Sequence, residues 1–507
     1  MSRTKTFLQN SITTAVYQAI VMISGFIVPR IMLVYYGSEI NGLISSINQF
    51  ITYFNLVEAG LSGATVYSLY KPLAENDHKG ISAIVVAAKN FYIKSGYFFV
   101  GLVLALSLIY PLFIHLDELS PISISILIIA LGAKGFLEFF TLAKYRTLLT
   151  AAQKTYVISI ASSVYVVLNT IIIFVLSMLK CNILMVYILA IVALYARSLI
   201  LIIYARKNFS YIDYNEEPNN SALDKRWDAL FLQVLQSVHV GAPTVLATIL
   251  TNLKMVSVYS VFNMVMVGIN GILSIFVSGL SATFGDIIVR NEVDTLQKSY
   301  REFECVYYMI ITFVYSVTMI MLQPFVSVYT TGVKDANYYQ PLIAFLFVLN
   351  GFLHNLKTPQ GMLVISAGHY KETKWQTITQ ALIAIVFGFI FGKYLGLVGI
   401  LVGMCLSNLY RDIDLMFYIP KNVTHLSYKS TLIRIIRKIV DFMIIVFPFY
   451  YIKLDISNYL NWVFYAVLTS VYALAVILVE GLIFERNSIK SIFNRLLSMV
   501  KRQKNVN

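Results

Sequence analysis

The sequence predicts an all-α, polytopic membrane protein with about fourteen transmembrane helices. Of its 507 residues, 58% are hydrophobic and only 13% are charged, whereas a soluble domain carries about 25% charged residues. The apolar residues also gather in blocks of about 20 or more, the length that a helix needs to cross a bilayer. Lipid cannot satisfy exposed irregular backbone, so these blocks are predicted to be helical. A porin-type barrel of alternating strands would have a much lower average hydropathy.

Fourteen apolar stretches define the predicted spans, and short polar connections separate most of them. They cover residues 11–35, 40–66, 91–114, 121–143, 155–179, 183–204, 229–250, 256–285, 303–328, 341–366, 375–393, 397–419, 433–452 and 460–484. The first apolar run is too long for a signal peptide and no small-residue cleavage site precedes it. We therefore expect it to be a retained first span.

The basic residues predict the orientation of the spans. The chain carries 39 Lys and Arg against 25 Asp and Glu. With the N-terminus in the cytoplasm and alternate loops assigned, 27 basic residues fall on that side and 5 on the other. This bias follows the positive-inside rule and places both termini in the cytoplasm. It also explains the basic character of the chain without a nucleic-acid partner.

Two related stretches indicate an internal repeat. Residues 57–71 read VEAGLSGATVYSLYK and residues 277–290 read VSGLSATFGDIIVR, so that Gly60 and Ser62 align with Gly279 and Ser281. Weaker matches at nearly the same offset favour two parallel six-span repeats. Both copies lie at predicted cytoplasmic span ends, and we expect these four small residues to form part of an inner gate.

The repeat and the loop lengths predict the domain organisation. A six-helix lobe would cover residues 1–204, a polar cytoplasmic linker residues 205–228, and a second six-helix lobe residues 229–419. Two extra helices would follow at 420–484, and a basic cytoplasmic tail at 485–507.

Charged residues inside the predicted spans are the candidate site residues, because charge at membrane depth is costly and by default faces a cavity or a partner. Lys134 and Glu138 are spaced i, i+4 and can pair with each other, a structural role as plausible as ligand binding. Arg30 has no nearby acid, but its side chain could also reach the outer headgroups. Asp441 and Glu480 are expected to reach the cytoplasmic interface. The cationic candidates for substrate binding are Arg30, Lys134, Lys357 and Arg411.

Polar residues in the early spans of each half are candidates to line a cavity or to couple transport to an ion. They recur at helical spacing, which suits a water-filled cavity, although hydrogen bonds between packed helices would give the same pattern. The candidates in these spans are Asn48, Asn55, Glu58 and Gln236, and Asp412 and Asp414 in the span 397–419 are further candidates for coupling.

The sequence gives no sign of a cofactor, a metal site or an enzyme. It has no phosphate-binding P-loop, so ATP is not the implied energy source. Its six histidines are dispersed and its three cysteines are scattered, so neither a metal cluster nor a disulfide framework is expected.

Short motifs along nearly the whole chain carry a resemblance to a known family. They are YGSEINGL at 36–43, NLVEAGLS at 55–62, YRTLL with AQKTY at 145–156, AGHYK at 367–371 and GLVGI at 396–400. The chain resembles the multidrug/oligosaccharidyl-lipid/polysaccharide exporter superfamily. Within it, the chain is most similar to the polysaccharide transporter family, the Wzx-type flippases of O-antigen and capsule repeat units.

The resemblance implies a flippase that moves an undecaprenyl-diphosphate-linked oligosaccharide across a bacterial cytoplasmic membrane by alternating access. It also implies two lobes around a cationic cavity, with Arg30 where such flippases commonly carry a basic residue. Glycosyltransferases and a polysaccharide polymerase for O-antigen, capsule or exopolysaccharide would be its partners. The alternative is a cation-coupled multidrug exporter, to which Glu58, Asp412 and Asp414 would be suited; a membrane-integral polysaccharide enzyme is a third, weaker reading.

Overall fold

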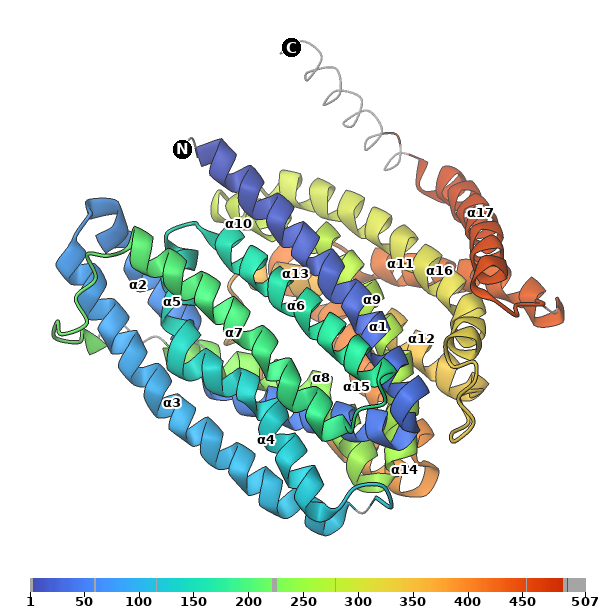
Figure 1. Ribbon diagram of the computed structural model, residues 1–507. Coiled ribbons are helices and arrows are strands. Elements are labelled where there is room, and N and C mark those ends of the chain that lie inside the picture. The colour runs from blue at the N-terminus through green and yellow to red at the C-terminus, as the bar shows by residue number, and fades with distance from the viewer. Residues whose placement is uncertain are drawn as a thin grey trace. The chain divides into compact units, whose positions relative to one another are not determined.

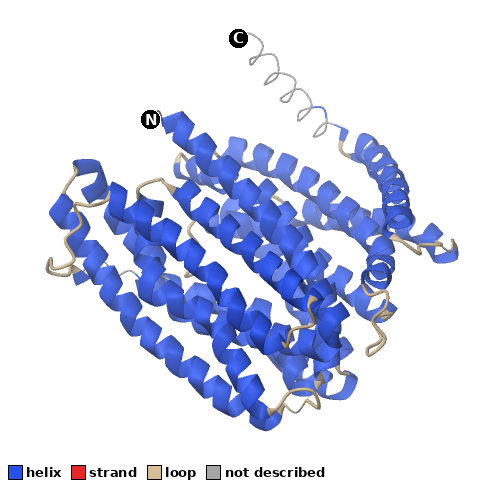
Figure 2. Ribbon diagram, in the orientation of Figure 1, coloured by secondary structure: helices blue, strands red, loops and turns tan. Residues whose placement is uncertain are grey.

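The computed structural model describes residues 3–58, 61–114, 116–220, 226–278, 280–452, 454–486 and 490. Within these ranges the chain forms helices joined by short loops and contains no strand (Figure 2). The predicted all-α class is therefore confirmed. By contacts between residues, the chain divides into two compact units, the first comprising residues 1–248 and 252–257 and the second residues 249–251 and 258–507.

Ten of the described helical stretches are long and apolar enough to cross a membrane. The first runs from Lys5 to Glu75 and contains the predicted spans 11–35 and 40–66. The predicted spans 341–366, 397–419 and 433–452 are also helical, but these helices are shorter or carry more charge than the ten. The chain is a multi-pass membrane protein.

The first unit is built from the N-terminal helices (Figure 1). Its elements are α1 (Arg3–Phe54), the 3₁₀ turn η1 (Asn55–Glu58), α2 (Leu61–Glu75), α3 (His78–Phe113), α4 (Pro121–Leu137), the π-helical turn η2 (Glu138–Leu142), α5 (Ala143–Ala151), α6 (Thr155–Met178) and α7 (Ile183–Asn208). Most of α8 (Arg226–Leu250) and the start of α9 (Leu253–Ser278) also belong to it. Its buried side chains, such as Leu43, Leu127 and Val186, join α1, α4 and α7 in one apolar core.

The second unit holds the rest of α9 and all later helices. These are α10 (Leu280–Val289), α11 (Val293–Tyr329), α12 (Pro341–Leu356), α13 (Thr358–Ser366), α14 (Lys374–Leu395), α15 (Leu397–Ile419), the π-helical turn η4 (Pro420–Thr424), α16 (Tyr428–Tyr451) and α17 (Tyr459–Phe484). Helices α14 and α15 approach closely because glycines face each other: a Cβ on Gly403 would meet the backbone of Gly388. Small residues at such positions permit this close approach of two helices.

Gly37 divides α1 into two helical segments. Its backbone has φ 80° and ψ 175°, which lies outside the helical region. Only glycine adopts such a conformation at low cost, because a Cβ would collide with the backbone. The chain therefore turns from the first predicted span into the second at this residue, as the predicted break between residues 35 and 40 requires.

Helices α16 and α17 are fixed to α11 by buried ion pairs. Arg434 on α16 binds Glu304 on α11 at 2.8 Å and Glu485, just after α17, at 2.8 Å. Lys438 pairs with Asp441 at 2.8 Å and also with Glu480. Asp441 and Glu480 are only 3% and 8% exposed. Our expectation that these two carboxylates reach the interface is thus wrong, because cations on the same pair of helices hold them inside.

Candidate functional site

A group of buried charges lies in the first unit and brings five elements together. Arg146 on α5 binds Glu58 on η1 at 2.9 Å and Glu138 on η2 at 3.0 Å. Arg197 on α7 binds the other oxygen of Glu138 at 2.9 Å. Lys134 lies one turn before Glu138 on α4. We call these five residues the first charge cluster; it contains three cations and two carboxylates, so it retains one positive charge.

Both carboxylates of the first charge cluster lie where a helix is interrupted. Glu58 is the last residue of a 3₁₀ turn, and Glu138 begins a π-helical turn in which the Ala143 N–H donates to the Glu138 carbonyl. A π-helical turn accommodates an extra residue, shifts the face that each later side chain presents, and occurs frequently at functional sites. Transporters bind substrates and ions at interrupted membrane helices. The first charge cluster is therefore a candidate site, because both of its carboxylates lie at such interruptions.

The predicted pair between Lys134 and Glu138 is not formed. Glu138 instead binds Arg146 and Arg197, because two guanidinium groups approach it from α5 and α7 and together occupy both of its oxygens. The Lys134 ammonium lies 5.6 Å from the centre of the Tyr165 ring on α6, a cation–π contact. Among the described ion pairs, none involves Lys134, which leaves it as the cluster's surplus cation.

A second polar group lies in the second unit, at the break between α12 and α13. Lys357 is the residue at this break. Its ammonium donates to Asn408 Oδ1 on α15 at 2.6 Å, and Gln380 on α14 donates to the same oxygen at 3.3 Å. The Asn408 amide in turn donates to Asn350 Oδ1 on α12 at 2.8 Å. We call Lys357, Asn408, Gln380, Asn350 and Asp412 the second polar cluster.

Asp412 is the member of the second polar cluster whose side chain accepts no hydrogen bond from the described residues. It follows Asn408 by four residues on α15, so both side chains lie on one face of the helix. Both of its carboxylate oxygens are buried without a hydrogen-bond partner among the described residues, although the charge of Lys357 acts on it electrostatically. A buried carboxylate without a bonded donor is unfavourable as an anion and favours a proton or a cation.

Arg411 and Asp414, in contrast, satisfy each other. The Arg411 guanidinium binds Asp414 at 2.5 Å across one turn of α15. Arg411 is buried, and the pair leaves no surplus charge at this position. The predicted cation Arg411 is therefore held in an ion pair. The carboxylate of its neighbour Asp412, in contrast, has no hydrogen-bond partner among the described residues.

The remaining predicted residues lie on several elements. Arg30 is half-buried on α1, directly after Pro29, and Asn55 is half-buried on η1. Asn48 and Gln236 are exposed on α1 and α8. The predicted gate residue Ser62 lies near Tyr92 of α3. Ser281 on α10 shares a 3.2 Å hydrogen bond with Ser366 on α13. Gly60 and Gly279 lie outside the described residues.

Arg146 is the functional candidate that sequence reasoning missed. It follows the apolar stretch 121–143, where the alternation of loops predicts the cytoplasmic side. The structure places it on a helix between two carboxylates, with a side chain only 26% exposed. The spacing of Lys134, Glu138 and Arg146 along one continuous helical stretch was the available signal, because charges at intervals of four and eight share a helix face.

The described residues contain no group of three or more His, Cys, Asp or Glu side chains that could hold a metal ion. The chemistry of both clusters is that of guanidinium, ammonium, carboxylate and amide groups. Such groups can bind an anion, exchange ion-pair partners, or take up a proton or a monovalent cation.

Solved structures show which fold this is. A multidrug resistance MATE family transporter of the MOP superfamily, in an inward-facing conformation, has a TM-score of 0.67 at 16% identity and covers 84% of this chain and 99% of its own. The lipid II flippase MurJ, in an inward closed conformation, has a TM-score of 0.64 at 14% identity and covers 94% of this chain and 100% of its own. A MATE structure in the bent conformation has a TM-score of 0.58 at 15% identity, with 84% and 96% coverage.

The chain matches no family model and no curated protein by sequence. The chain thus has the fold of MATE transporters and of the MurJ flippase, which confirms the fold that the sequence resemblance implies.

Proposed function

We propose that the protein is a flippase that moves a diphosphate-linked lipid saccharide across a bacterial cytoplasmic membrane by alternating access, with both termini in the cytoplasm. The observation that carries the proposal is the extent of the fold. The flippase structure covers 94% of the chain and the MATE structures described above cover 84%. Helices α16 and α17, with 24 and 26 residues, are together about a tenth of the chain, which is the size of this difference.

The way in which α16 and α17 are attached supports the same proposal. Buried ion pairs fix them to α11, so they are part of the second unit's core and not a loose appendage. A mainly apolar cavity of about 440 Å³ lies beside α16, with Pro324 of α11, Val446 and Phe449 in its wall. A cavity with such a lining suits a hydrocarbon chain, which a lipid-linked substrate carries and a free polar sugar does not.

The charges support an anionic substrate. The first charge cluster has a surplus positive charge, and each of its arginines can form paired hydrogen bonds to phosphate oxygens. In the structure these guanidinium groups are paired with Glu58 and Glu138. A diphosphate would compete with the carboxylates, so substrate binding would release contacts that join η1, η2, α5 and α7. Such an exchange of partners is a physical means of coupling binding to helix movement.

Loss of the cationic candidates tests the proposal in cells. In a strain that depends on this gene for surface polysaccharide, Arg30→Ala and Lys357→Ala are expected to abolish the polysaccharide while the protein remains in the membrane at normal amounts. Lys393→Ala, which removes an exposed cation at the end of α14, is the matched control and should support normal export. Normal export by both test variants would refute an anion-binding role for Arg30 and Lys357.

Asp412 favours a second candidate function, a cation-coupled multidrug exporter. A buried carboxylate whose oxygens lack hydrogen-bond donors is suited to bind and release a proton or a sodium ion during transport. In that case, deletion of the gene would increase sensitivity to cationic drugs, Asp412→Asn would reproduce the effect, and the amount of surface polysaccharide would not change.

A further inference from the structure

The segment that follows α7 is fixed to the first unit and does not behave as a free linker. Phe209 is only 7% exposed and is part of an apolar core cluster with Leu148 and Leu201. The Tyr211 ring stacks on His78 with 3.9 Å between ring centres. The backbone N–H of Asp213 donates to Ser82 Oγ at 3.1 Å, which holds the segment against the start of α3.

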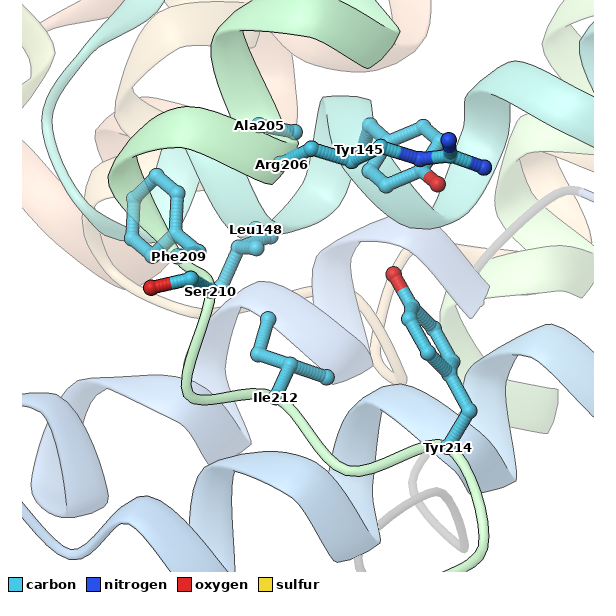
Figure 3. A pocket seen from close by; sticks show the side chains of 8 residues that line it. All are labelled: Tyr145, Leu148, Ala205, Arg206, Phe209, Ser210, Ile212 and Tyr214. Atoms are coloured by element: carbon cyan, nitrogen blue, oxygen red, sulfur yellow. The ribbon is translucent and has the colours of Figure 1, made fainter.

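This docked segment closes a small cavity of about 210 Å³ (Figure 3). The wall is formed by α5, the end of α7 and the segment itself, with the residues Tyr145, Leu148, Ala205, Arg206, Phe209, Ser210, Ile212 and Tyr214. In the figure, the Tyr214 hydroxyl points toward the side chains of Tyr145 and Arg206. The Tyr145 and Tyr214 hydroxyl groups also act on each other electrostatically.

Three cations surround the tyrosines of this cavity. The Lys144 ammonium lies 5.0 Å from the ring centres of both Tyr145 and Tyr214, and the Lys89 ammonium lies 5.4 Å from that of Tyr214. Arg206 lines the cavity itself and acts electrostatically on both Lys144 and Tyr214. None of the three cations takes part in an ion pair among the described residues, unlike the arginines of the first charge cluster.

The acidic residues nearby do not neutralise this group. Asp213, in the same segment, accepts a hydrogen bond from the backbone N–H of Asn215 at 2.9 Å. Glu216 and Glu217 follow but form no described ion pair with the three cations. Lys89 and Lys144 face aromatic rings, and none of the three cations has an acidic partner among the described ion pairs. The group therefore leaves a positive field over the cavity, and such a field attracts an anion.

The hydroxyl groups provide the remaining chemistry. Burial, and then the interaction with Tyr145, raises the pKa of the Tyr214 hydroxyl above its ordinary value, so it stays protonated and can donate. Guanidinium, ammonium and neutral hydroxyl donors around one small cavity are the groups that proteins use to bind phosphate. The positive-inside count assigns this end of α7 to the cytoplasmic side, where phosphate esters and anionic lipid headgroups are both present.

We propose that Lys89, Lys144 and Arg206, together with Tyr145 and Tyr214, form a binding site for a phosphate group on the cytoplasmic side of the first unit, separate from the charges within the membrane. Lys144 and Arg146 lie two residues apart on the nine-residue helix α5. An anion held at this site would fix α5 and the end of α7, the two helices that bring the arginines of the first charge cluster to Glu138. The proposal does not depend on which substrate is transported.

Two arms of one experiment test the site on the full-length protein and distinguish its possible ligands. In detergent, inorganic phosphate is titrated at constant ionic strength against chloride. In nanodiscs, phosphatidylglycerol is titrated into phosphatidylcholine. Thermal unfolding reports binding in both arms, since a ligand that binds the folded state raises the unfolding temperature. A saturable increase with phosphate alone identifies a soluble ligand, and one with phosphatidylglycerol alone identifies a lipid headgroup.

The variant Arg206→Gln is expected to weaken the response about tenfold or more, because it removes charge-assisted hydrogen bonds to the anion. Its matched control is Lys207→Gln, which removes the same charge from the next, exposed residue outside the cavity wall and should respond as the wild type does. Lys144→Gln is a second test variant. The proposal is overturned if the wild type shows no saturable response in either arm. It is equally overturned if Arg206→Gln lowers the basal unfolding temperature but leaves the titration midpoint unchanged, as a purely structural role requires.

Discussion

Removal of Arg434 should detach α16 and α17 from α11. The Arg434 guanidinium donates to Glu304 at 2.8 Å and forms two hydrogen bonds to Glu485, at 2.8 and 2.9 Å. The side chain of Glu304 is 1% exposed. Arg434→Ala therefore leaves a buried carboxylate whose remaining donors include the neutral hydroxyls of Tyr300 and Thr431. Breaking a buried ion pair by removing one partner costs about 3–5 kcal/mol.

This cost can be measured through Cys305, the neighbour of Glu304. Its side chain is 2% exposed, so a thiol reagent reaches it only when the helices separate. A loss of 3–5 kcal/mol corresponds to an increase in local opening of about 10²- to 4 × 10³-fold. With Cys181 and Cys405 replaced by serine, the rate of Cys305 labelling should rise by about that factor in Arg434→Ala.

Lys429→Ala is the control, since it removes an exposed cation from the first turn of the same helix. Its labelling rate should equal that of the unmodified protein, because exposed charges contribute at most about 1 kcal/mol. Labelling at the same rate in Arg434→Ala and in the control would show that the Arg434 ion pairs do not hold α16 in place against α11.

Three further substitutions have outcomes that thermal unfolding of the purified protein can check. Gly403→Ala places a Cβ against the backbone of α14 and should cost about 1–3 kcal/mol, whereas Gly25→Ala meets no atom within 4 Å and should be tolerated; equal stability of the two variants contradicts the packing argument. Gly37→Ala forces a side chain into a backbone conformation with φ 80° and should also cost about 1–3 kcal/mol; an unchanged unfolding temperature would show that the bend relaxes freely. Glu138→Gln deprives two arginines of their shared carboxylate and should cost about 3–5 kcal/mol, while Glu75→Gln, in an exposed pair on α2, should change stability by less than about 1 kcal/mol; similar losses in both would deny the importance of burial.

The helical spans could be predicted from sequence because the bilayer dictates their length and their composition. An apolar run of about 20 residues has few alternatives to a helix in lipid. The break near Gly37 was visible for the same reason, as a polar interval between two apolar runs. The close packing of α14 and α15 also has a signal in the sequence, since small residues at intervals of four permit two helices to approach closely.

Partner choice among the charges could not be predicted, because it depends on which helices meet. The i, i+4 spacing correctly placed Lys134 and Glu138 one turn apart, but Arg197 arrives from a helix some sixty residues later and takes the carboxylate. The partner of Arg434 could not be predicted either, although the residue begins the predicted span 433–452. Its acid, Glu304, lies 130 residues away, and no local pattern reveals such a pairing.

Of the two helix interruptions next to charged residues, only the one at Lys357 has a signal in the sequence. Pro359 gave a signal for the break at Lys357, because proline cannot donate within a helix, and the structure indeed ends α12 there. The π-helical turn at Glu138 has no comparable signal: its sequence, EFFTL, contains neither glycine nor proline. It follows from packing of the surrounding helices and not from local propensity.

Translocation by the purified protein is the direct test of whether it is a lipid-saccharide flippase. The protein is reconstituted in proteoliposomes with a fluorescent undecaprenyl-diphosphate-linked oligosaccharide, and an enzyme added outside modifies only the sugar on the outer leaflet. We expect the protein to make the protected, inner-leaflet substrate accessible, and Lys357→Gln to slow this exchange whereas Lys393→Gln does not. Protection that persists equally with and without the protein, together with ion-driven export of a cationic drug by the same preparation, would contradict the flippase proposal.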